Sequence, residues 1–597
     1  MDIITQTNTL KFAARLVDRS VSMTPTLKLL VDKPLCPKDS EELQPFPRVR
    51  PEDEGVDPGY IADFLSELKA EKSLDMHGVL IVKNGKVICN AEFGAYHSCF
   101  WQAEHSLSKS VTATAIGMLI DDGKLSLDDR AVKILEKRTP PLAQLTHKSM
   151  TVRHLLTMTS GITFSESGAI VEENWIRAFF ESKLRTEPGK VFNYNSMNTF
   201  ILSCIVHEIS GVTLREFLQP RLFEPLGITV YNWEKGPDGN ELGGWGLYLR
   251  REDAAKIAKL YLDGGVWNGR RLLSENWCRT ATAPKMKVTG NTGNFDYGYQ
   301  IWTGRNTDSF LFNGMFGQDA ISFRQTGTIV VSNAGIEQIF QQSVYYDIVE
   351  RYFGKKYYSD AAIKYSKKGW KRLDSILCEI SDTPKIKRGF LGLPVRKKLP
   401  EFLASACVKT FSVKKPDEKE IIRTASVTGT ATVGLLPIVE QVMRNRYTKG
   451  VNSFSFSRDG EGIRLTVTEG SNECVLPVFP GRTQYTIVRL SDTEYHLAVT
   501  AEAAYDEDGR GVLKLRLSFP EISGARMMKI YFDNGFLDVK MREIPGIGLV
   551  KLAAEVLEDA VKDKKALSDI VSRLDADLFY AKIKNTVEPE FRLFADR

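Results

Sequence analysis

The sequence feature that most constrains the fold is the placement of strand-like segments at both ends of one long stretch of chain. Residues 77–93 have two apolar runs around Asn84-Gly85, a dipeptide that favours a tight hairpin turn. Strands at both ends must pair to bury their apolar faces, so we predict one α+β domain whose sheet joins the two ends. Short alternating runs return at 297–303, 309–314, 319–325 and 328–335, and apolar residues at helical spacing fill 106–125, 151–158, 198–211 and 251–265.

Two further helices and a second domain are expected around this segment. Residues 57–72 and 337–353 have helical periods, and 356–400 form a basic, mostly helical connector. The predicted organisation is an N-terminal extension (1–50), the α+β domain (51–355), the connector (356–400) and a mainly antiparallel β domain (401–597) that ends in helices. Strand patterns of that last domain fall at 462–470, 472–479, 484–490, 494–503, 511–519, 525–533 and 536–544, and amphipathic helical patterns at 549–561 and 566–583.

Length and composition exclude several classes of protein. At 597 residues the chain is too long for one domain. A net charge of +5, from 80 basic and 75 acidic residues, favours neither a nucleic-acid nor a membrane partner. The N-terminus does not resemble a signal peptide, and the eight dispersed cysteines fit reduced thiols, so we expect a soluble, cytoplasmic protein without a metal or organic cofactor.

Ser106 and Lys109 are the first candidate for chemistry. They lie one helical turn apart at the start of a segment rich in small and apolar residues, which predicts a buried helix. A serine at a helix start has free backbone N–H groups that can face an oxyanion, and a desolvated lysine can accept the hydroxyl proton. The alternative is an N-cap serine with a surface lysine. The same pattern recurs at Ser66 and Ser412, in more charged surroundings.

Two later segments supply partners for this pair. Tyr194 lies in a polar loop before an apolar helix, where it could shuttle a proton with Lys109, although a buried aromatic is the simpler interpretation. Gly314 and Gly317 lie between two strand runs and permit close approach of a ligand to the backbone. The N–H of Gln318 would then be a second oxyanion donor, whereas glycines at a plain strand bend are the alternative.

Together these motifs resemble the serine β-lactamase and penicillin-recognising superfamily. The resemblance spans about residues 45–353 and is nearest to class C-like esterases, D-aminopeptidases and nylon-oligomer hydrolases; it rests on HSLSKSVTATAIGMLIDDGKLSLDD, TVRHLLTMTSGIT, FNYNSMNTFILS, FEPLGI, REDAAKIAKLYLDGGVWNGRRLL and YGYQIW. It implies a β-lactamase-like antiparallel sheet flanked by helices, with a helical insertion. It also implies Ser106 as nucleophile, Lys109 as its activator, Tyr194 as proton shuttle and the amides of Ser106 and Gln318 as oxyanion hole.

Two departures from that family's pattern concern the substrate. Met315-Phe316-Gly317 stands where β-lactamases have Lys-Thr-Gly, so a cation that would hold a substrate carboxylate is missing. The Tyr-x-Asn motif is here Tyr194-Asn195-Ser196, with Asn198 two residues further on. Both changes favour an esterase or amidase over a β-lactamase or carboxypeptidase. Gly317, Phe316, Ser196 and Asn198 are the predicted substrate-binding residues beside Gln318.

The predicted function is hydrolysis of an ester or amide through an acyl-serine, on a small-molecule or peptide-like substrate. A non-catalytic binding module on the same fold stays open, as does a penicillin-binding carboxypeptidase or β-lactamase. The histidines have no metal-ligand spacing, and we interpret His105 and His154 as structural. Formation of a homo-oligomer through the C-terminal domain is a further open prediction.

Overall fold

The computed structural model describes residues 33–169, 172–289, 293–338, 341–382, 399–407, 409–413, 433–444, 446–546, 548 and 587–596. The chain divides into two compact units, with the boundary between Ser381 and Asp382. The helices predicted at 549–561 and 566–583 lie outside the described residues.

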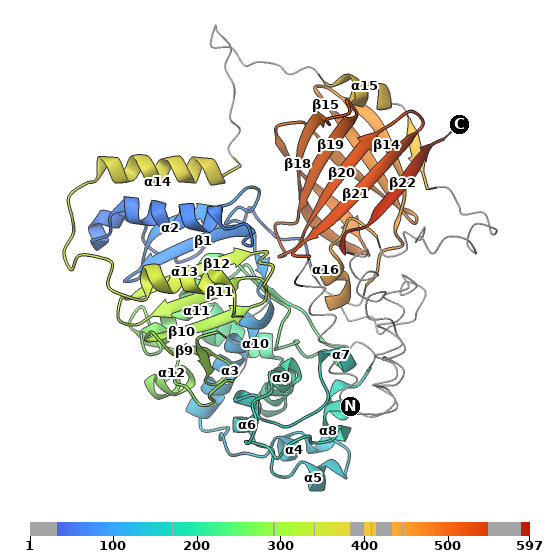
Figure 1. Ribbon diagram of the computed structural model, residues 1–597. Coiled ribbons are helices and arrows are strands. Elements are labelled where there is room, and N and C mark those ends of the chain that lie inside the picture. The colour runs from blue at the N-terminus through green and yellow to red at the C-terminus, as the bar shows by residue number, and fades with distance from the viewer. Residues whose placement is uncertain are drawn as a thin grey trace. The chain divides into compact units, whose positions relative to one another are not determined.

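In the described part of the first unit, seven strands form one antiparallel sheet in the order β2-β1-β12-β11-β10-β9-β8 (Figure 1). The hairpin predicted around Asn84-Gly85 is present, with positive φ at both residues. β1 also pairs with β12, in a register that sets Val79 opposite Ser332, so the sheet joins the two ends of the segment as predicted. The strands are β1 (Met76–Lys83), β2 (Lys86–Glu92), β8 (Phe295–Tyr297), β9 (Trp302–Gly304), β10 (Ser309–Gly314), β11 (Gln318–Phe323) and β12 (Thr328–Ala334).

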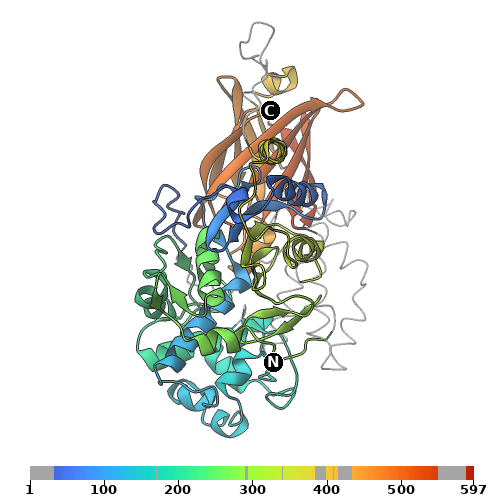
Figure 2. The same ribbon diagram turned by 90° about the vertical axis from the view of Figure 1, so that its left-hand side faces the viewer.

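Helices cover both faces of this sheet. α2 (Pro58–Ala70) and α13 (Val344–Phe353) share one apolar core with the inward residues of the central strands. α11 (Arg251–Leu262) packs on the opposite face, where Tyr261 meets Phe312 edge-on. The side view shows α11 and α13 on opposite sides of the strands (Figure 2). Every residue of β10, β11 and β12 is buried, as expected for strands covered on both faces.

A helical insertion separates β2 from β8, in agreement with the predicted fold class. Its central helices are α3 (Ser108–Asp121) and α9 (Ser196–Ser210), which contact each other. Gly117 permits a close contact in α3, because a Cβ at this position would lie 2.5 Å from the Trp277 ring. The other elements are η2 (Pro51–Glu54), β3 (Gln102–Ala103), η3 (His105–Leu107), α4 (Ala131–Ile134), η4 (Glu136–Arg138), α5 (Ala143–Thr146), α6 (Val152–Leu156), α7 (Glu166–Ala169), α8 (Trp175–Glu181), α10 (Leu214–Leu218), η5 (Gln219–Phe223), β4 (Asn232–Trp233), β5 (Leu247–Leu249), β6 (Val266–Trp267), β7 (Arg270–Arg271) and α12 (Glu275–Ala281).

Part of the predicted connector packs onto the first unit. Residues of this segment form α14 (Lys367–Ile380), which lies along α2 with Leu373 and Ile376 buried. Trp370 Nε1 donates to the Glu52 carboxylate at 2.8 Å, and Arg372 forms an ion pair with Asp63. α14 is therefore an integral layer of the first unit.

The described part of the second unit contains ten strands in one antiparallel sheet, in the order β16-β15-β14-β13-β22-β21-β20-β19-β18-β17. The two edge strands, β16 and β17, contact each other, so the sheet curls round on itself. All seven strands predicted here are present, as β15 to β21. The elements are α15 (Glu401–Ala406), β13 (Thr410–Ser412), α16 (Ile438–Met443), β14 (Val451–Asp459), β15 (Gly462–Glu469), β16 (Asn472–Val478), β17 (Thr483–Leu490), β18 (Thr493–Tyr505), β19 (Gly511–Ser518), β20 (Ala525–Phe532), β21 (Phe536–Ile544) and β22 (Glu590–Ala595).

A buried ion pair links α16 to this sheet. Arg526 and Glu543 are fully buried, and their charged groups lie 3.0 Å apart. The Glu543 carboxylate also accepts the first free backbone N–H groups of α16, from Ile438 at 2.8 Å and Val439 at 3.2 Å. A carboxylate at this position satisfies helix N–H groups and is favoured by the helix dipole. Among the described helices, no single one is long and apolar enough to cross a membrane, and α9 with α10 and η5 passes that test only as a pair bent by 69°.

Candidate active site

Ser106 lies in the one-turn helix η3, immediately before α3. The chain enters this turn through His105, which has a φ of 45°. Leu107 N donates to Glu104 O at 3.1 Å, and the Ser108 hydroxyl donates to His105 O at 2.6 Å, so the turn is closed by local bonds. The Ser106 side chain is half-buried. Ser106 therefore stands at the N-terminal end of a buried helix, as the sequence predicts.

Lys109 lies one turn further on and is almost completely buried, at 1% exposed. Its Nζ donates to Ser106 Oγ at 2.8 Å, to Ser196 Oγ at 2.9 Å and to Gly244 O at 2.7 Å. Burial disfavours the ammonium form and lowers the pKa of Lys109 to about 7, although the nearby Glu166 carboxylate partly opposes this change. Near neutral pH a large fraction of Lys109 is therefore an amine able to accept a proton.

Tyr194 lies over this pair. Lys109 Nζ is 5.0 Å from the centre of the Tyr194 ring, and the phenol hydroxyl interacts with Ser106. The ring is held by Trp302, stacked at 5.7 Å, and by Tyr297, edge-on at 6.0 Å. Burial raises the pKa of Tyr194, so its hydroxyl is protonated at neutral pH and can donate a hydrogen bond or a proton.

The start of α9 brings Ser196, rather than Asn198, to the lysine. Asn195 caps this helix by accepting from Met197 N at 2.9 Å, which places Ser196 in the first turn facing Lys109. Asn198 is fully buried and donates to Asn195 O at 3.1 Å and to Met158 Sδ at 3.5 Å. Ser196 thus stands where the family pattern expects an amide.

Glu166 and Gly244 also belong to the site, although no motif in the sequence marks them. Glu166 Oε1 accepts from Ser196 N at 2.7 Å, and its charge acts on both Lys109 and Tyr194. Gly244 contributes only its carbonyl oxygen to Lys109. Neither residue has a sequence signal: Glu166 begins the one-turn helix α7, Gly244 lies in an irregular segment, and both are far along the chain from Ser106.

The turn between β10 and β11 carries Gly317 and Gln318. This turn has positive φ at Phe316 (65°) and Gly317 (87°), and a Cβ at Gly317 would lie 2.5 Å from Ile336 Cδ1. η3 contacts both β10 and β11, so the turn lies beside the Ser106 segment. The Gln318 side chain is fully buried and donates to Ala334 O at 2.6 Å. The group of Gln318 that could act in the site is therefore its backbone N–H, the predicted oxyanion donor.

Phe316, a predicted substrate contact, and His105, the neighbour of Ser106, both lie inside the protein. Phe316 is fully buried, and its ring meets His105 edge-on at 5.5 Å; its contact with a substrate stays a prediction. Burial and the neighbouring Lys109 lower the pKa of His105 to about 4, and His105 is therefore uncharged at neutral pH. Its packing agrees with the structural role expected from the sequence.

The other Ser-x-x-Lys patterns lack this geometry. Ser66 is exposed within α2 and donates to Ala62 O at 2.6 Å, while Lys69 forms an ion pair with Glu379. Ser412 donates to Asp596 Oδ2 at 3.0 Å. Among the described residues, Ser106 is the serine of this pattern that contacts a buried lysine. This contact supports the choice of Ser106 over Ser66 and Ser412, which the sequence context predicts.

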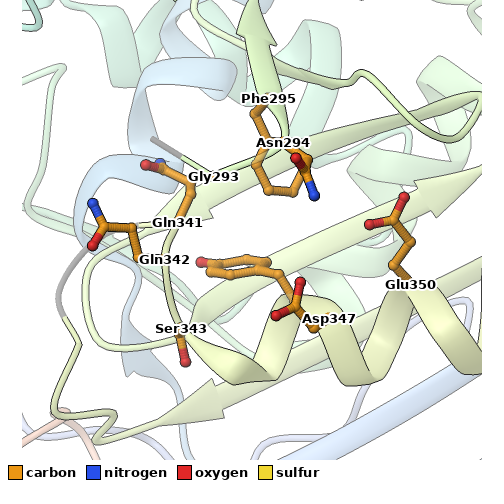
Figure 3. A pocket seen from close by; sticks show the side chains of 9 residues that line it. Gly293, Asn294, Phe295, Gln341, Gln342, Ser343, Asp347 and Glu350 are labelled. Atoms are coloured by element: carbon orange, nitrogen blue, oxygen red, sulfur yellow. The ribbon is translucent and has the colours of Figure 1, made fainter. Parts of the chain in front are cut away.

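A pocket of about 290 Å³ lies elsewhere in the first unit, beside α13 (Figure 3). Asp347 and Glu350 of α13 point toward it, and Gln341 and Phe295, the first residue of β8, also line it. Ser106, Lys109 and Tyr194 do not line this pocket. It is separate from the candidate active site.

An antiparallel sheet covered on both faces, with a Ser-x-x-Lys helix facing a tyrosine loop, defines the class of penicillin-recognising folds. Residues 61–337 match the family model described as Beta-lactamase, and this part of the chain is a domain of the serine β-lactamase and penicillin-binding-protein superfamily. The predicted superfamily and fold class are thereby confirmed.

Curated relatives include a hydrolase. The chain is 26% identical over 259 residues to the 6-aminohexanoate-dimer hydrolase of Paenarthrobacter ureafaciens, covering 38% of this chain and 64% of that protein. It is 28% identical over 170 residues to protein flp of Staphylococcus aureus strain COL, covering 25% of this chain and 33% of flp. The chain thus spans less than two thirds of either relative's length.

Solved structures also match part of this chain. The hydrolase EstCE1, described as having promiscuous acyltransferase activity, is 16% identical, with a TM-score of 0.43, over 50% of this chain and 99% of that chain.

Proposed function

We propose that the protein is a serine hydrolase that cleaves a carboxylic ester or a linear amide through an acyl-Ser106 intermediate. The observation that carries this proposal is the 2.8 Å contact between Ser106 Oγ and the buried Lys109 Nζ, whose pKa lies near 7. A lysine with an ordinary pKa would be protonated at neutral pH and unable to act as a base.

The chemistry follows from the positions of the three side chains. Lys109 accepts the hydroxyl proton as Ser106 Oγ attacks the carbonyl carbon of the substrate. The backbone amides of Ser106 and Gln318 hold the resulting oxyanion. Tyr194, with its hydroxyl beside Ser106, passes the proton to the leaving alcohol or amine, and water then hydrolyses the acyl-enzyme.

Two residues near the site, Met315 and Glu166, bear on which class of substrate the enzyme would accept. Met315 stands in the turn after β10, where a lysine would hold a carboxylate in β-lactamases. The carboxylate that does reach the site, Glu166, would repel an anionic substrate. We therefore favour neutral or cationic esters and amides over β-lactams and peptidoglycan carboxylates.

The test is covalent labelling of the full chain with a fluorophosphonate probe, read by intact mass and peptide mapping. We expect one adduct on Ser106, its loss in Ser106→Ala, and its retention in the matched control Ser66→Ala, since Ser66 has the same local motif without a buried lysine. Hydrolysis of p-nitrophenyl esters should follow the same pattern, and nitrocefin should be a poor substrate. A folded protein without an adduct would favour the binding-module alternative.

A further inference from the structure

Behind the turn that carries Gln318, three fully buried polar side chains form a continuous bridge. Asn333 of β12 donates from Nδ2 to Glu104 Oε1 at 3.2 Å and to Gln318 Oε1 at 3.0 Å. Asn333 is 1% exposed, and Glu104 and Gln318 are 0% exposed. The two hydrogens of one planar amide group are thus shared between two separate segments of the chain.

The two ends of this bridge belong to the two halves of the proposed oxyanion hole. Glu104 lies two residues before Ser106, and its backbone N–H is fixed to Leu247 O at 2.8 Å. Gln318 supplies the second amide and is fixed through its side chain to Ala334 O at 2.6 Å. An amide donor must lie about 2.7–3.1 Å from the oxyanion, so small displacements of either segment weaken it.

The same two segments also approach at the backbone. A Cβ at Gly314 would lie 2.2 Å from the carbonyl oxygen of Glu104, so only glycine permits this contact. On the other side of the turn, Ser332 Oγ donates to Gly317 O at 2.9 Å, and Ile336 N donates to Phe316 O at 3.0 Å. β12 and the residues just after it therefore bond to the backbone of the turn, while the Asn333 side chain bonds to Glu104.

We propose that Asn333 is a positioning residue that sets the separation of the Ser106 and Gln318 amides. This inference rests on the proposed acyl-serine chemistry. Asn333 does not touch the reacting atoms, and its effect is transmitted through Glu104 and Gln318. Replacing it by an apolar residue leaves two buried oxygen acceptors without that donor and frees the two segments to move apart.

The test compares Asn333→Leu with Thr328→Val in the full chain. Thr328 lies on the same strand, is equally buried, and loses bonds to Thr326 O and the Tyr357 hydroxyl when replaced by valine. We would measure Tm, kcat and KM for a p-nitrophenyl ester, and the inhibition constant of an alkyl boronic acid, whose tetrahedral adduct places an oxygen in the oxyanion hole.

Asn333→Leu should lower kcat by about 10- to 100-fold with KM within about twofold, because removing an oxyanion donor outright costs about 100- to 1000-fold and displacement costs less. The boronic acid should weaken by the same factor as kcat/KM. Thr328→Val should retain wild-type kcat. If Asn333→Leu does not fold, Gln318→Met removes the other end of the bridge, and we expect the same loss of kcat with KM retained.

Three results would overturn the inference. Unchanged kcat in a folded Asn333→Leu variant, with only Tm reduced as in Thr328→Val, would show a purely structural role. Unchanged kcat in Gln318→Met would do the same if that variant is the one that folds. A wild-type protein without a Ser106 adduct would remove the proposed function and this inference together, whereas a labelled wild type with an equally active variant would remove this inference alone.

Discussion

The lowered pKa of Lys109 predicts how the acylation rate changes with pH. Burial shifts this pKa from 10.5 to about 7. At pH 7, about half of the Lys109 side chains are then neutral, compared with about one in 3,000 for a lysine of ordinary pKa. The difference corresponds to about 5 kcal/mol in favour of the neutral amine, which is the form that can accept the Ser106 proton.

The rate of inactivation by a fluorophosphonate should therefore rise tenfold per pH unit below about pH 6 and level off above about pH 8. Glu166→Gln removes a carboxylate that favours the ammonium form, so the rising limb should move to lower pH, by roughly half a pH unit. Glu173→Gln is the matched control, because Glu173 is an exposed acid of the same segment and does not contact Lys109.

The assay is the second-order labelling rate from pH 5 to 9, measured by intact mass at low probe concentration. A rate that stays flat over this range, or that still rises tenfold per pH unit between pH 8 and 9, would refute the assignment of Lys109 as the base. An identical profile in Glu166→Gln would refute the electrostatic role of Glu166 while leaving Lys109 in place.

Three other predictions concern separate parts of the molecule. Tyr194→Phe should lower kcat at least about 100-fold in ester hydrolysis at an unchanged Tm, because it removes the proton donor and keeps the ring; retained kcat would exclude the shuttle. Burial raises the pKa of Asp319 to about 7 from 3.8, so its protonated form stabilises the fold at low pH and this contribution is lost as pH rises from about 4 to 7. The Tm of Asp319→Asn relative to wild type should accordingly increase across that range, and a constant difference would contradict the assignment. Arg526→Met should destabilise the second unit by about 3–5 kcal/mol in urea unfolding, because Glu543 is left buried without its partner, whereas Arg526→Met with Glu543→Gln should recover part of the loss.

The sequence predicted the parts of the structure that follow from local pattern. Asn84-Gly85 marked the first hairpin, and alternation located the seven strands β15 to β21 of the second unit. One predicted strand, 297–303, is divided into β8 and β9, because Gln300 adopts a φ of 60° and its side chain bonds to carbonyl oxygens of α6 instead of continuing the ladder. β14 was not among the predicted strands, because its apolar alternation is short: Asn452 and Arg458 occupy the positions in phase with Phe454 and Phe456.

The candidate site was predictable only where motifs carry it. The Ser-x-x-Lys motif and the tyrosine loop that follows it identified Ser106, Lys109 and Tyr194 as candidates, and the structure places them in contact. Asn198 and Phe316, predicted as substrate contacts from their position in the sequence, are both fully buried, and their contact with a substrate stays a prediction. Glu166 depends on a tertiary contact between segments that have no shared pattern, so no local rule could find it.

The pairing of β1 with β12 has a consequence for synthesis of the protein. Val79 meets Ser332 in the middle of the sheet, so β1 has to wait for some 250 residues to be translated, or about 10–50 s, before its central neighbour exists. Until then, the contacts between β1 and β12 are absent, and contacts of such long sequence separation form slowly. Strands β14 to β21, by contrast, mostly pair with their neighbours in sequence and can form as each hairpin leaves the ribosome. A nascent chain halted before residue 328 would therefore present the free edge of β1, where a chaperone or a second nascent chain could pair with it.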